Sequence, residues 1–308
     1  MVGAAQVPGG DARVSTALLV TGGRGQLGTD LVAAATRAGI AEVRAPGSAE
    51  LDVTDPTAVR AAVRALAGAG ASAVVVNAAA YTAVDAAECD PERAHAVNAT
   101  GPAHLAAACV AHGARLVHVS TDYVFAGDAP APYRADDPTG PRSVYGLSKL
   151  AGERAALDAG AHVVRTAWLY GAHGANFVRT MVRLERSHRT VPVVDDQRGS
   201  PTWTADLADG LVALALATDR VPPGVLHCVN SGATTWCGFA RAVFAEIGAD
   251  PERVRPCTTA EFPRPAPRPA NSVLDTASWT TAGLPPLRPW RAALAAAFTA
   301  QRAALTAP

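Results

Sequence analysis

The sequence predicts an α/β fold, a doubly wound parallel sheet followed by a smaller C-terminal α/β lobe. Two patterns indicate it. Apolar runs of strand length alternate with helical stretches of ten or more residues over the first half of the chain, which is typical of parallel strands joined by right-handed crossovers. Near residue 170 this alternation ends, and beyond residue 255 the chain becomes proline-rich. The second half is therefore expected to form the smaller lobe.

Five apolar runs are expected to be the strands of the sheet. The first ends in glycine and the second is weak; in chain order they read TALLVTGG, AEVRAPG, ASAVVVNAAA, ARLVHVS and AHVVRTAWLY. Helices are expected between them, at LGTDLVAAATRAG, DPTAVRAAVRALAGAG, PERAHAVNATGPAHLAAACVAHG and SVYGLSKLAGERAALDAG. Asp55 has the chemistry of an N-cap and Pro56 suits the first helical position, so the second helix should begin there.

The domain boundaries follow from where this alternation holds. We expect a disordered leader over residues 1–14 and a nucleotide-binding domain over 15–168. Residues 169–308 are expected to form mainly the smaller lobe. Segment 171–190 has a mostly helical pattern and 204–217 the pattern of an amphipathic helix, and part of the region near 191–220 should return to the nucleotide-binding domain. The stretch FPRPAPRPANS can be neither a helix nor a central strand. The smaller lobe is expected to bind the substrate across the carboxyl ends of the strands.

The composition argues against several classes of function. Lys+Arg and Asp+Glu both number 27, and no basic run occurs, so neither nucleic acid nor an anionic membrane is an expected partner. No run of eighteen apolar residues could span a membrane, and the first residues do not look like a signal peptide, so a cytoplasmic protein is expected. The five cysteines and eight histidines form no Cys-x-x-Cys or His-x-x-x-His pair, and no metal site is expected.

A glycine-rich turn joins the first expected strand to the first expected helix. It reads TGGRGQLG, with Gly22, Gly25 and Gly28 spaced by three. A dinucleotide site needs a tight turn, a backbone that approaches the pyrophosphate closely, and a helix N-terminus directed at the anion. A glycine triplet alone is weak evidence, but its place between a strand and a helix predicts a Rossmann-type nucleotide site.

The region after the second strand bears on the choice of cofactor. An acidic residue there would bind the ribose 2′-hydroxyl of NADH, but none occurs before residue 50. Arg24, Arg44 and Ser48 lie nearer that position, so NADPH is slightly preferred and NADH stays allowed. In LDVTD, Asp52 and Val53 are candidate adenine contacts; alternatively, Asp52 is an ordinary turn residue.

Tyr145 and Lys149 are one helical turn apart, so their side chains should lie on one face of a helix. A phenol with a pKa of about 10 is a poor acid–base catalyst at neutral pH, and a nearby ammonium is expected to lower that pKa. Lys149 can also hydrogen-bond the nicotinamide ribose. Thr121 ends the fourth strand, where its hydroxyl can bind the same substrate oxygen. Together with the glycine turn, these residues predict a carbonyl-reducing site.

A series of stretches between about residues 17 and 276 matches one known family in order. They read GGRGQLG, LDVTD, VVNAAAYTAVDAAE, VNATGPAHLA, VHVSTDYVF, YGLSKLAGE, RTAWLYG, NFVRTM, VVDDQRGSPT and RPANSVLDT. The chain thereby resembles the dTDP-4-dehydrorhamnose reductases, within the extended short-chain dehydrogenase/reductases. The glycine turn and Tyr-x-x-x-Lys belong to the whole superfamily, whereas NAAAYTAVDAAE, STDYVF and DDQRGSPT are specific to this family.

The resemblance implies an NAD(P)H-dependent enzyme that reduces the 4-keto group of a dTDP-linked 4-keto-6-deoxyhexose in deoxysugar biosynthesis, as a monomer or homodimer. It assigns Tyr145 as proton donor, Lys149 as its partner and ribose ligand, and Thr121 as ligand of the substrate oxygen. The implied cofactor-binding residues are Gly22, Gly25, Gln26, Leu27, Gly28, Asp52, Val53, Ala78, Ala79, Ala80, Tyr81, Thr82, Tyr145 and Lys149. The implied substrate-binding residues are Val84, Thr121, Asp122, Tyr123, Trp168 and Asn176.

The chain departs from the family pattern at two places. Ser143 stands where asparagine is frequent, and the usual arginine after the second strand is replaced around APGSAE. The identity of the sugar therefore stays open: it is rhamnose, a streptose-type sugar or another secondary-metabolite deoxysugar. The C4 configuration of the product stays open as well. Tyr123 and Trp168 are either sugar contacts or core aromatics. Some members use magnesium at a glutamate-lined dimer interface, and that cluster is not located in this sequence.

Other interpretations remain beside this one. Asp122 binds the sugar, braces its loop, or serves the elimination chemistry of a nucleotide-sugar epimerase or dehydratase of the same superfamily. A non-catalytic, NADP-binding regulatory subunit is a third interpretation, although such proteins need not keep the tyrosine and lysine. Asp195 and Asp196 look like an acid–base pair but are expected to hold a loop. Arg264 and Arg268 meet the diphosphate or are solvated.

Overall fold

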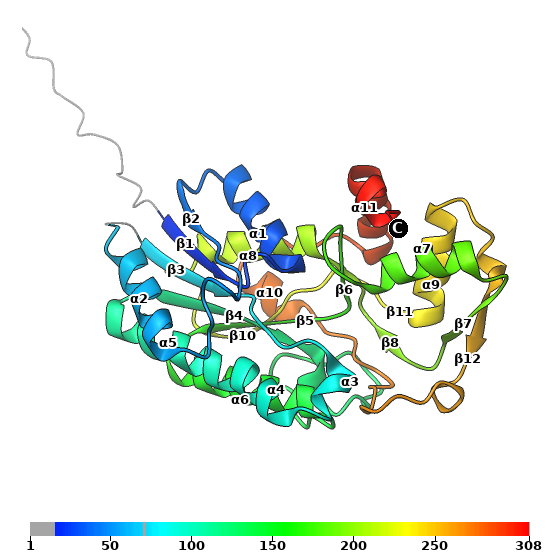
Figure 1. Cartoon of the computed structure of the whole chain (residues 1–308), viewed down its shortest axis with the longest axis horizontal. Helices are drawn as coiled ribbons and strands as arrows, with labels where there is room; N and C mark the ends of the chain where they lie inside the picture. The colour runs from blue at the N-terminus through cyan, green and yellow to red at the C-terminus, as the bar shows by residue number, and fades with distance from the viewer. Residues whose placement is uncertain (1–15, 70–71, 308) are drawn as a thin grey trace, which may run out of the picture.

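A six-stranded parallel sheet forms the centre of the molecule (Figure 1). The computed structural model describes residues 16–69 and 72–307, and the expected leader lies outside them. The strand order is β10-β5-β4-β3-β1-β2, with β1 (Thr16–Thr21), β2 (Glu42–Arg44), β3 (Ser72–Asn77), β4 (Arg115–Thr121), β5 (His162–Thr166) and β10 (Gly224–His227). All five expected strands are present, and the predicted doubly wound fold is confirmed.

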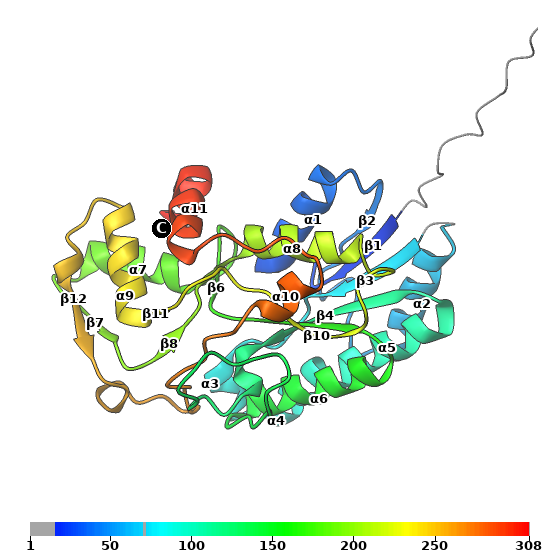
Figure 2. The same ribbon diagram turned by 180° about the vertical axis from the view of Figure 1, so that it is seen from behind.

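Helices cover both faces of the sheet (Figures 1 and 2). One face packs against α1 (Gln26–Arg37) and α8 (Thr204–Ala215), and the other against α2 (Pro56–Ala67), α5 (Gly101–His112) and α6 (Val144–Asp158). Side chains alternate between the two faces of a strand. In β1, Leu18 and Val20 therefore join the core under α1 and α8, whereas Ala17 and Leu19 join the core under α2 and α5.

Two features of this sheet differ from the expectation. The sixth strand, β10, was not expected; it follows Pro222 and Pro223 and pairs in parallel with β5 at the sheet edge. Helix α8 was expected to be amphipathic, but nine of its twelve residues are buried. The reason is that α1 and β1 cover one side of it, while Trp279 and Leu284 join the same core, with the Trp279 ring beside Gly210.

The predicted start of α2 is confirmed in detail. The Asp55 carboxylate accepts hydrogen bonds from the amides of Thr57 at 2.8 Å and Ala58 at 3.2 Å, and Pro56 is the first helical residue. Two of the amides that a helix leaves unpaired at its start are thus satisfied, which stabilises the helix.

The smaller lobe has a hydrophobic core of its own, which contains Met181, Phe239, Phe244 and Leu294. It is built from α7 (Phe177–Ser187), α9 (Trp236–Glu246), α11 (Trp290–Leu305), β7 (Val191–Val194) and β12 (Val254–Cys257). Figure 1 shows this lobe beyond the carboxyl ends of the central strands. The proline-rich stretch is extended, as expected, and carries neither helix nor longer strand between residues 262 and 276.

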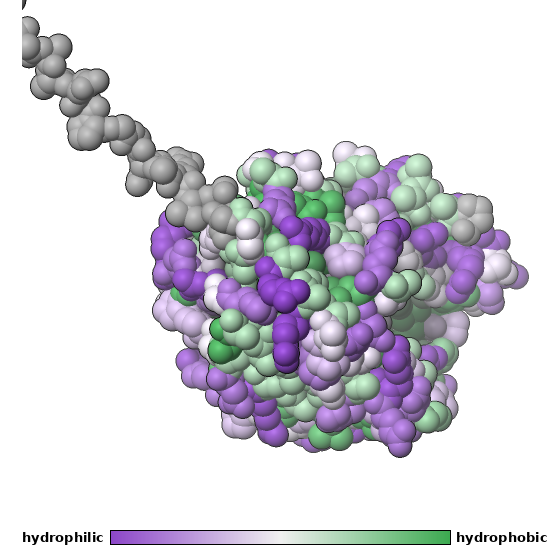
Figure 3. Space-filling view, turned by 60° about the vertical axis from the view of Figure 1, so that its left-hand side comes forward, coloured by the Kyte–Doolittle hydropathy of each residue, from purple (hydrophilic) through white to green (hydrophobic). Residues whose placement is uncertain are grey.

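Short elements complete the fold. They are β6 (Leu169–Tyr170), β8 (Arg198–Gly199), β9 (Thr202–Trp203), β11 (Thr234–Thr235), α3 (Val84–Ala87), α4 (Pro91–His95), α10 (Ala277–Thr281), the π-helical turn η1 (Ala96–Thr100) and the 3₁₀ turns η2 (Asp122–Val124), η3 (Pro251–Arg253) and η4 (Thr259–Glu261). Hydrophilic and hydrophobic residues are mixed on the face shown in Figure 3. Within the described ranges, every helix is too short or too polar to cross a membrane.

Candidate active site

A cavity of about 430 Å³ opens where the carboxyl ends of β1, β3, β4 and β5 meet. Strand order reverses at β1, and folds of this class bind ligands at such a point. The expected site residues that line it are Gly25, Gln26, Leu27, Ala78, Ala80, Thr82, Val84, Thr121, Asp122, Tyr123, Tyr145, Lys149 and Trp168. The expected residues outside the lining are Gly22, Gly28, Asp52, Val53, Ala79, Tyr81 and Asn176.

The glycine turn has the close packing that a phosphate cradle needs. Gly22 has φ +69°, and a Cβ there would lie 2.9 Å from Cα of Ala79. A Cβ on Gly28 would meet the carbonyl oxygen of Gly22 and lie 2.7 Å from Cα of Gly23. Helix α1 begins after Gly25, and no side chain of the described residues caps its first turn. Its free amides and positive end therefore fit a pyrophosphate.

Tyr145 and Lys149 lie one turn apart on α6, and both reach the cavity. The Tyr145 phenol lies near the hydroxyl of Thr121, which ends β4, and this hydroxyl acts to lower the pKa of the phenol. Lys149 Nζ donates to the carbonyl oxygen of Val119 at 2.7 Å. Ser143, the departure from the family pattern, is the N-cap of α6 and accepts from the Gly146 amide at 3.1 Å. A strand end and a helix start thus bring the three predicted catalytic side chains together.

The electrostatics of Tyr145 differ from the expectation that Lys149 lowers its pKa. Burial raises the pKa of Tyr145 to about 12; the Thr121 hydroxyl opposes this rise and the Asp122 carboxylate adds to it. Burial lowers the pKa of Lys149 to about 8, against the attraction of Glu153. Lys149 is not among the groups that shift the pKa of Tyr145, and its ammonium donates to a carbonyl of β4 instead. The phenol is therefore protonated at neutral pH, as a proton donor must be.

A buried ion pair supports this strand end from behind. Glu153 of α6 and Arg165 of β5 form two hydrogen bonds, of 2.9 and 2.8 Å, and their side chains are only 1% and 4% exposed. The Ser120 hydroxyl donates to Glu153 at 2.5 Å. The network joins α6 to β4 and β5 next to Thr121. Sequence reasoning missed it, although Glu153 lies one turn after Lys149 in the quoted YGLSKLAGE.

Asp122 is a buried carboxylate beside the catalytic residues. It is 3% exposed, and its Oδ1 accepts from the Thr121 hydroxyl at 2.9 Å. Its Oδ2 has no partner of good hydrogen-bond geometry in the described part of the chain. Burial raises the pKa of Asp122 to about 6, while the hydroxyls of Ser272 and Thr121 oppose the rise. The Thr121 hydroxyl thus contacts this carboxyl and also lies near the phenol.

Two buried asparagines that sequence reasoning missed hold the loop after β3. Asn98, in η1, accepts from the Tyr81 amide at 2.8 Å and donates to the Tyr81 carbonyl at 3.0 Å. Asn77 accepts from the Ala79 amide at 3.1 Å and from the Thr21 hydroxyl at 2.6 Å. Asn77 at the end of an expected strand, in VVVNAAA, and Asn98 within an expected helix, in VNATG, were the available signal. Tyr81 and Ala79 are therefore held just behind the residues that line the cavity.

Aromatic side chains from both lobes form the opposite wall. Tyr123 packs edge-on against Tyr145, with ring centroids 5.5 Å apart. Trp168 stacks on Trp236, with centroids 3.5 Å apart, and both rings line the cavity. Trp236 begins α9, and sequence reasoning missed it because only folding brings it to Trp168. Asn176 is the N-cap of α7 and donates to the Gln26 side chain at 3.1 Å, so it lies behind the wall.

The expected adenine contacts lie away from the cavity. Asp52 accepts from the Thr54 amide at 2.9 Å and hydroxyl at 2.8 Å, and these bonds lower its pKa. Val53 is buried in the core under α2 and α5. The structure therefore shows the turn role of Asp52, and the adenine contact stays a prediction. Glu50 pairs with Arg24, so folding brings an acid to the glycine turn that the sequence order had not indicated.

A second hollow of about 550 Å³ adjoins the cavity, because Tyr123 and Trp236 line both. It runs along α7 and β7 and includes Arg264 and Arg268. The two arginines are not merely solvated: both pair with Asp85, at 3.0 Å from Arg264 Nε and 2.9 Å from Arg268. The hollow therefore combines an apolar floor with two guanidinium groups.

The expected loop-holding aspartates lie outside the catalytic cavity. Asp195 accepts from the Thr235 hydroxyl at 2.5 Å, and Asp196 from the Thr259 amide at 2.8 Å and hydroxyl at 2.7 Å. Each joins two segments of the smaller lobe, so their structural interpretation holds. In the described ranges, no three His, Cys, Asp or Glu side chains are grouped to hold a metal.

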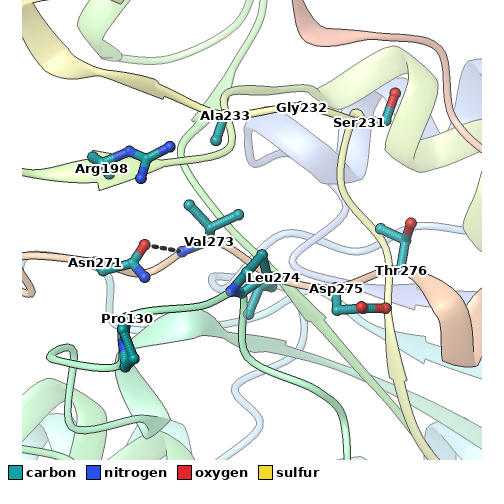
Figure 4. A pocket seen from close by; sticks show the side chains of 11 residues that line it. Pro130, Arg198, Ser231, Gly232, Ala233, Asn271, Val273, Leu274, Asp275 and Thr276 are labelled. Carbon is teal, nitrogen blue, oxygen red and sulfur yellow. Dashed lines mark hydrogen bonds between the residues drawn. The ribbon is translucent and has the colours of Figure 1, made fainter.

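Another cavity, of about 360 Å³, lies between β8, residues 231–233 and residues 271–276 (Figure 4). Its Asn271 and Asp275 accept from the backbone amides of Val273 and Ala277, at 3.3 and 2.6 Å. These side chains thus hold turns of the chain. The lining contains neither a phenol nor an ammonium, so this cavity is not the candidate active site.

Comparison with known proteins agrees with this geometry. The family model described as "RmlD substrate binding domain" matches residues 16–303. The chain is 56% identical to a dTDP-4-dehydrorhamnose reductase of Streptomyces griseus, over 92% of this chain and 93% of that one. It is 53% identical to the Mycobacterium tuberculosis protein of the same name, over 93% of each. A Streptomyces antibioticus relative, 50% identical over 91% and 94%, is named a probable dTDP-4,6-dihydroxy-2-methyloxan-3-one 4-ketoreductase.

Solved structures agree as well. A dTDP-4-dehydrorhamnose reductase of Clostridium acetobutylicum superposes with a TM-score of 0.86 at 38% identity, over 92% of this chain and 99% of that one. The Bacillus anthracis enzyme of the same name, in complex with NADP, also gives 0.86, at 33% identity over 93% and 99%. By the family model, by these relatives and by the fold they share, this chain belongs to the dTDP-4-dehydrorhamnose reductase family.

Proposed function

We propose that the chain reduces the 4-keto group of a dTDP-linked 4-keto-6-deoxyhexose with NADPH, in deoxysugar biosynthesis. One observation carries the proposal: the glycine turn and the trio of Tyr145, Lys149 and Thr121 converge on a single cavity. The relatives named above are reductases of dTDP-linked keto sugars, which supports this chemistry.

The side of the cavity that faces the sheet suits a nicotinamide dinucleotide. Gly22 and Gly28 leave no room for side chains in the turn, and the uncapped first turn of α1 offers its amides to the pyrophosphate. Lys149, which lines the cavity, holds the nicotinamide ribose in this proposal. When bound, this cofactor supplies the hydride, while the protein supplies position and charge.

The proton that completes the reduction comes from Tyr145. Its phenol, kept neutral by burial, donates to the carbonyl oxygen of the sugar as negative charge develops there. The Thr121 hydroxyl, which donates to Asp122, can turn to donate to the same sugar oxygen beside the phenol. The ammonium of Lys149 stabilises the phenolate that forms, and its lowered pKa allows it to pass a proton on.

The sugar nucleotide has space on the other side. The sugar lies between Val84, Tyr123 and Trp168, which line the catalytic cavity. The dTDP part extends into the adjoining hollow, where Arg264 and Arg268 can meet the diphosphate. Both guanidinium groups are shared with Asp85, which orients them.

NADPH is favoured because Arg24 offers its guanidinium at the glycine turn, where a 2′-phosphate would lie. The Bacillus anthracis relative binds NADP. The Arg24–Glu50 pair means that the phosphate competes with a carboxylate for this arginine. The preference over NADH is therefore expected to be modest.

A nucleotide-sugar dehydratase or epimerase is a second candidate, because Asp122 stands beside Thr121 with a pKa raised to about 6. Such an enzyme retains NAD, so NAD in the purified protein would favour it. A regulatory subunit would bind NADP without turnover.

The deciding experiment offers the purified chain a panel of dTDP-4-keto-6-deoxysugars with NADPH or NADH. The proposal predicts oxidation of the cofactor with one or more sugars, and NMR of the product then gives the sugar and its C4 configuration. Failure with every sugar, under conditions in which NADPH binds, would refute it.

A further inference from the structure

The indole ring of Trp168 lies in a slot with a wall on each face. Trp236 covers one face, with an interplanar angle of 6° and centroids 3.5 Å apart. On Gly199, a Cβ would lie 2.5 Å from Nε1 and 2.6 Å from Cζ2 of the same ring, and closer still to Cε2. The two stacked indoles are too close for another residue to lie between them, so Gly199 covers the opposite face of the Trp168 ring.

The backbone of Trp168 also needs this support. Its φ of +47° is the one positive value of a non-glycine residue within the described chain. A bulky side chain rarely adopts this conformation, and it persists only where the surroundings impose it. The Thr202 amide donates to the Trp168 carbonyl at 3.1 Å, which fixes the peptide after the ring.

The two walls of the slot belong to one ribbon. Strand β8 contains Gly199 and pairs antiparallel with β11, where Gly199 lies opposite Thr234. Strand β11 leads directly into α9, whose first residue is Trp236. The ribbon thereby sets the spacing between the walls, and the smaller lobe determines where the ring of Trp168 can lie.

The indole N–H of the ring held in this slot differs from those of two other tryptophans. The indole N–H groups of Trp203 and Trp279 donate to Gln301 at 3.2 Å and to the Pro285 carbonyl at 2.9 Å. No acceptor among residues 16–69 and 72–307 takes the N–H of Trp168, which lines the catalytic cavity. The clamped ring therefore presents a rigid edge and an N–H donor to whatever enters the cavity.

We propose that Gly199 and Trp236 form a clamp on Trp168, and that Trp236 is a positioning residue for the sugar. The inference rests on the proposed function, because it takes the occupant beside Trp168 to be the keto sugar. Loosening the clamp should weaken capture of the sugar nucleotide. It should spare cofactor binding, since neither Gly199 nor Trp236 belongs to the glycine turn or the loop after β3.

The kinetic test compares Trp236→Ala, Trp236→Phe and Trp290→Phe. Trp236→Ala should raise KM for the sugar nucleotide about tenfold, with a much smaller change in kcat and no change in NADPH affinity. Trp236→Phe should recover part of the loss. Trp290 belongs to the same aromatic cluster, 5.9 Å from Phe239, but lines neither hollow, so Trp290→Phe should keep the wild-type KM. A wild-type KM in Trp236→Ala would overturn the proposal.

A spectroscopic test does not depend on turnover. Two stacked indoles whose transition moments cross give an exciton couplet in circular dichroism, which Trp236→Phe and Trp168→Phe should abolish and Trp290→Phe should keep. Gly199→Ala, which forces a methyl group against the ring, should alter the couplet and raise KM with Trp236 intact. A couplet that survives in Trp236→Phe would refute the clamp. A wild-type chain that shows the couplet but reduces no dTDP-4-keto sugar would instead refute the proposed function.

Discussion

Replacing Asp122 with asparagine should stabilise the fold at pH 8, and by less as the pH falls. Burial raises the pKa of this carboxyl from 3.8 to about 6. Below the unfolded pKa the carboxyl is protonated in both states and costs nothing. As the pH rises through the folded pKa, the native state must hold a buried anion, so the free energy of unfolding of the wild type falls.

The magnitude follows from the shift. A rise of about two pKa units corresponds to about 3 kcal/mol, present in full at pH 8 and reduced to about 1 kcal/mol at pH 4.5. The amide side chain of Asp122→Asn keeps an oxygen that accepts from the Thr121 hydroxyl, so the loop is expected to survive the change. Any constant cost of the new amide cancels in the comparison between the two pH values.

Urea unfolding of the wild type and Asp122→Asn at pH 4.5 and pH 8 measures this difference. Asp196→Asn is the matched control, because its effect on the free energy of unfolding at pH 8 should have the opposite sign. Although partial burial works against it, hydrogen bonds from Thr259 lower the pKa of Asp196, so its loss should destabilise the chain at pH 8. A stability difference between the wild type and Asp122→Asn that is the same at both pH values would refute the reasoning. Turnover should persist in Asp122→Asn if Asp122 braces the loop, and vanish if it is the acid of an elimination.

Three further changes test other parts of the site. Thr121→Val removes the hydroxyl proposed to bind the sugar oxygen and should lower kcat/KM about tenfold, with Thr121→Ser as the near-wild-type control in the same assay. Glu153→Gln leaves Arg165 buried beside a neutral partner and should lower the free energy of unfolding by about 3 kcal/mol, measured in urea. Glu50→Gln frees Arg24 and should raise the preference for NADPH over NADH about threefold, measured as the ratio of kcat/KM values; an unchanged ratio would place the 2′-phosphate elsewhere.

The sheet was predictable because its strands are buried on both faces. Such strands read as continuous apolar runs, and each is followed by a helix long enough to cross back. The edge strand β10 escaped because Gly224–His227 is only four residues long and begins half-buried, directly after two prolines. Nothing in so short a run distinguishes a strand from a loop.

The catalytic trio was predictable because local geometry dictates it. Residues four apart on a helix share a face, and strand ends of a parallel sheet share an edge. The clamp on Trp168 was not, since Gly199 and Trp236 meet the ring only through the folded β8–β11 ribbon. The pKa of Tyr145 was expected in the wrong direction because its burial depends on α3, α4 and Tyr123, which pack around the phenol only in the folded chain.

The role of Tyr145 is tested most directly by one comparison of turnover. Wild type and Tyr145→Phe are given the same dTDP-4-keto-6-deoxyhexose with NADPH, and cofactor affinity is measured in parallel by fluorescence titration. The variant should bind NADPH as the wild type does and lose about a hundredfold or more in kcat, because the proton donor is gone. Wild-type turnover in Tyr145→Phe would contradict the assignment of the site.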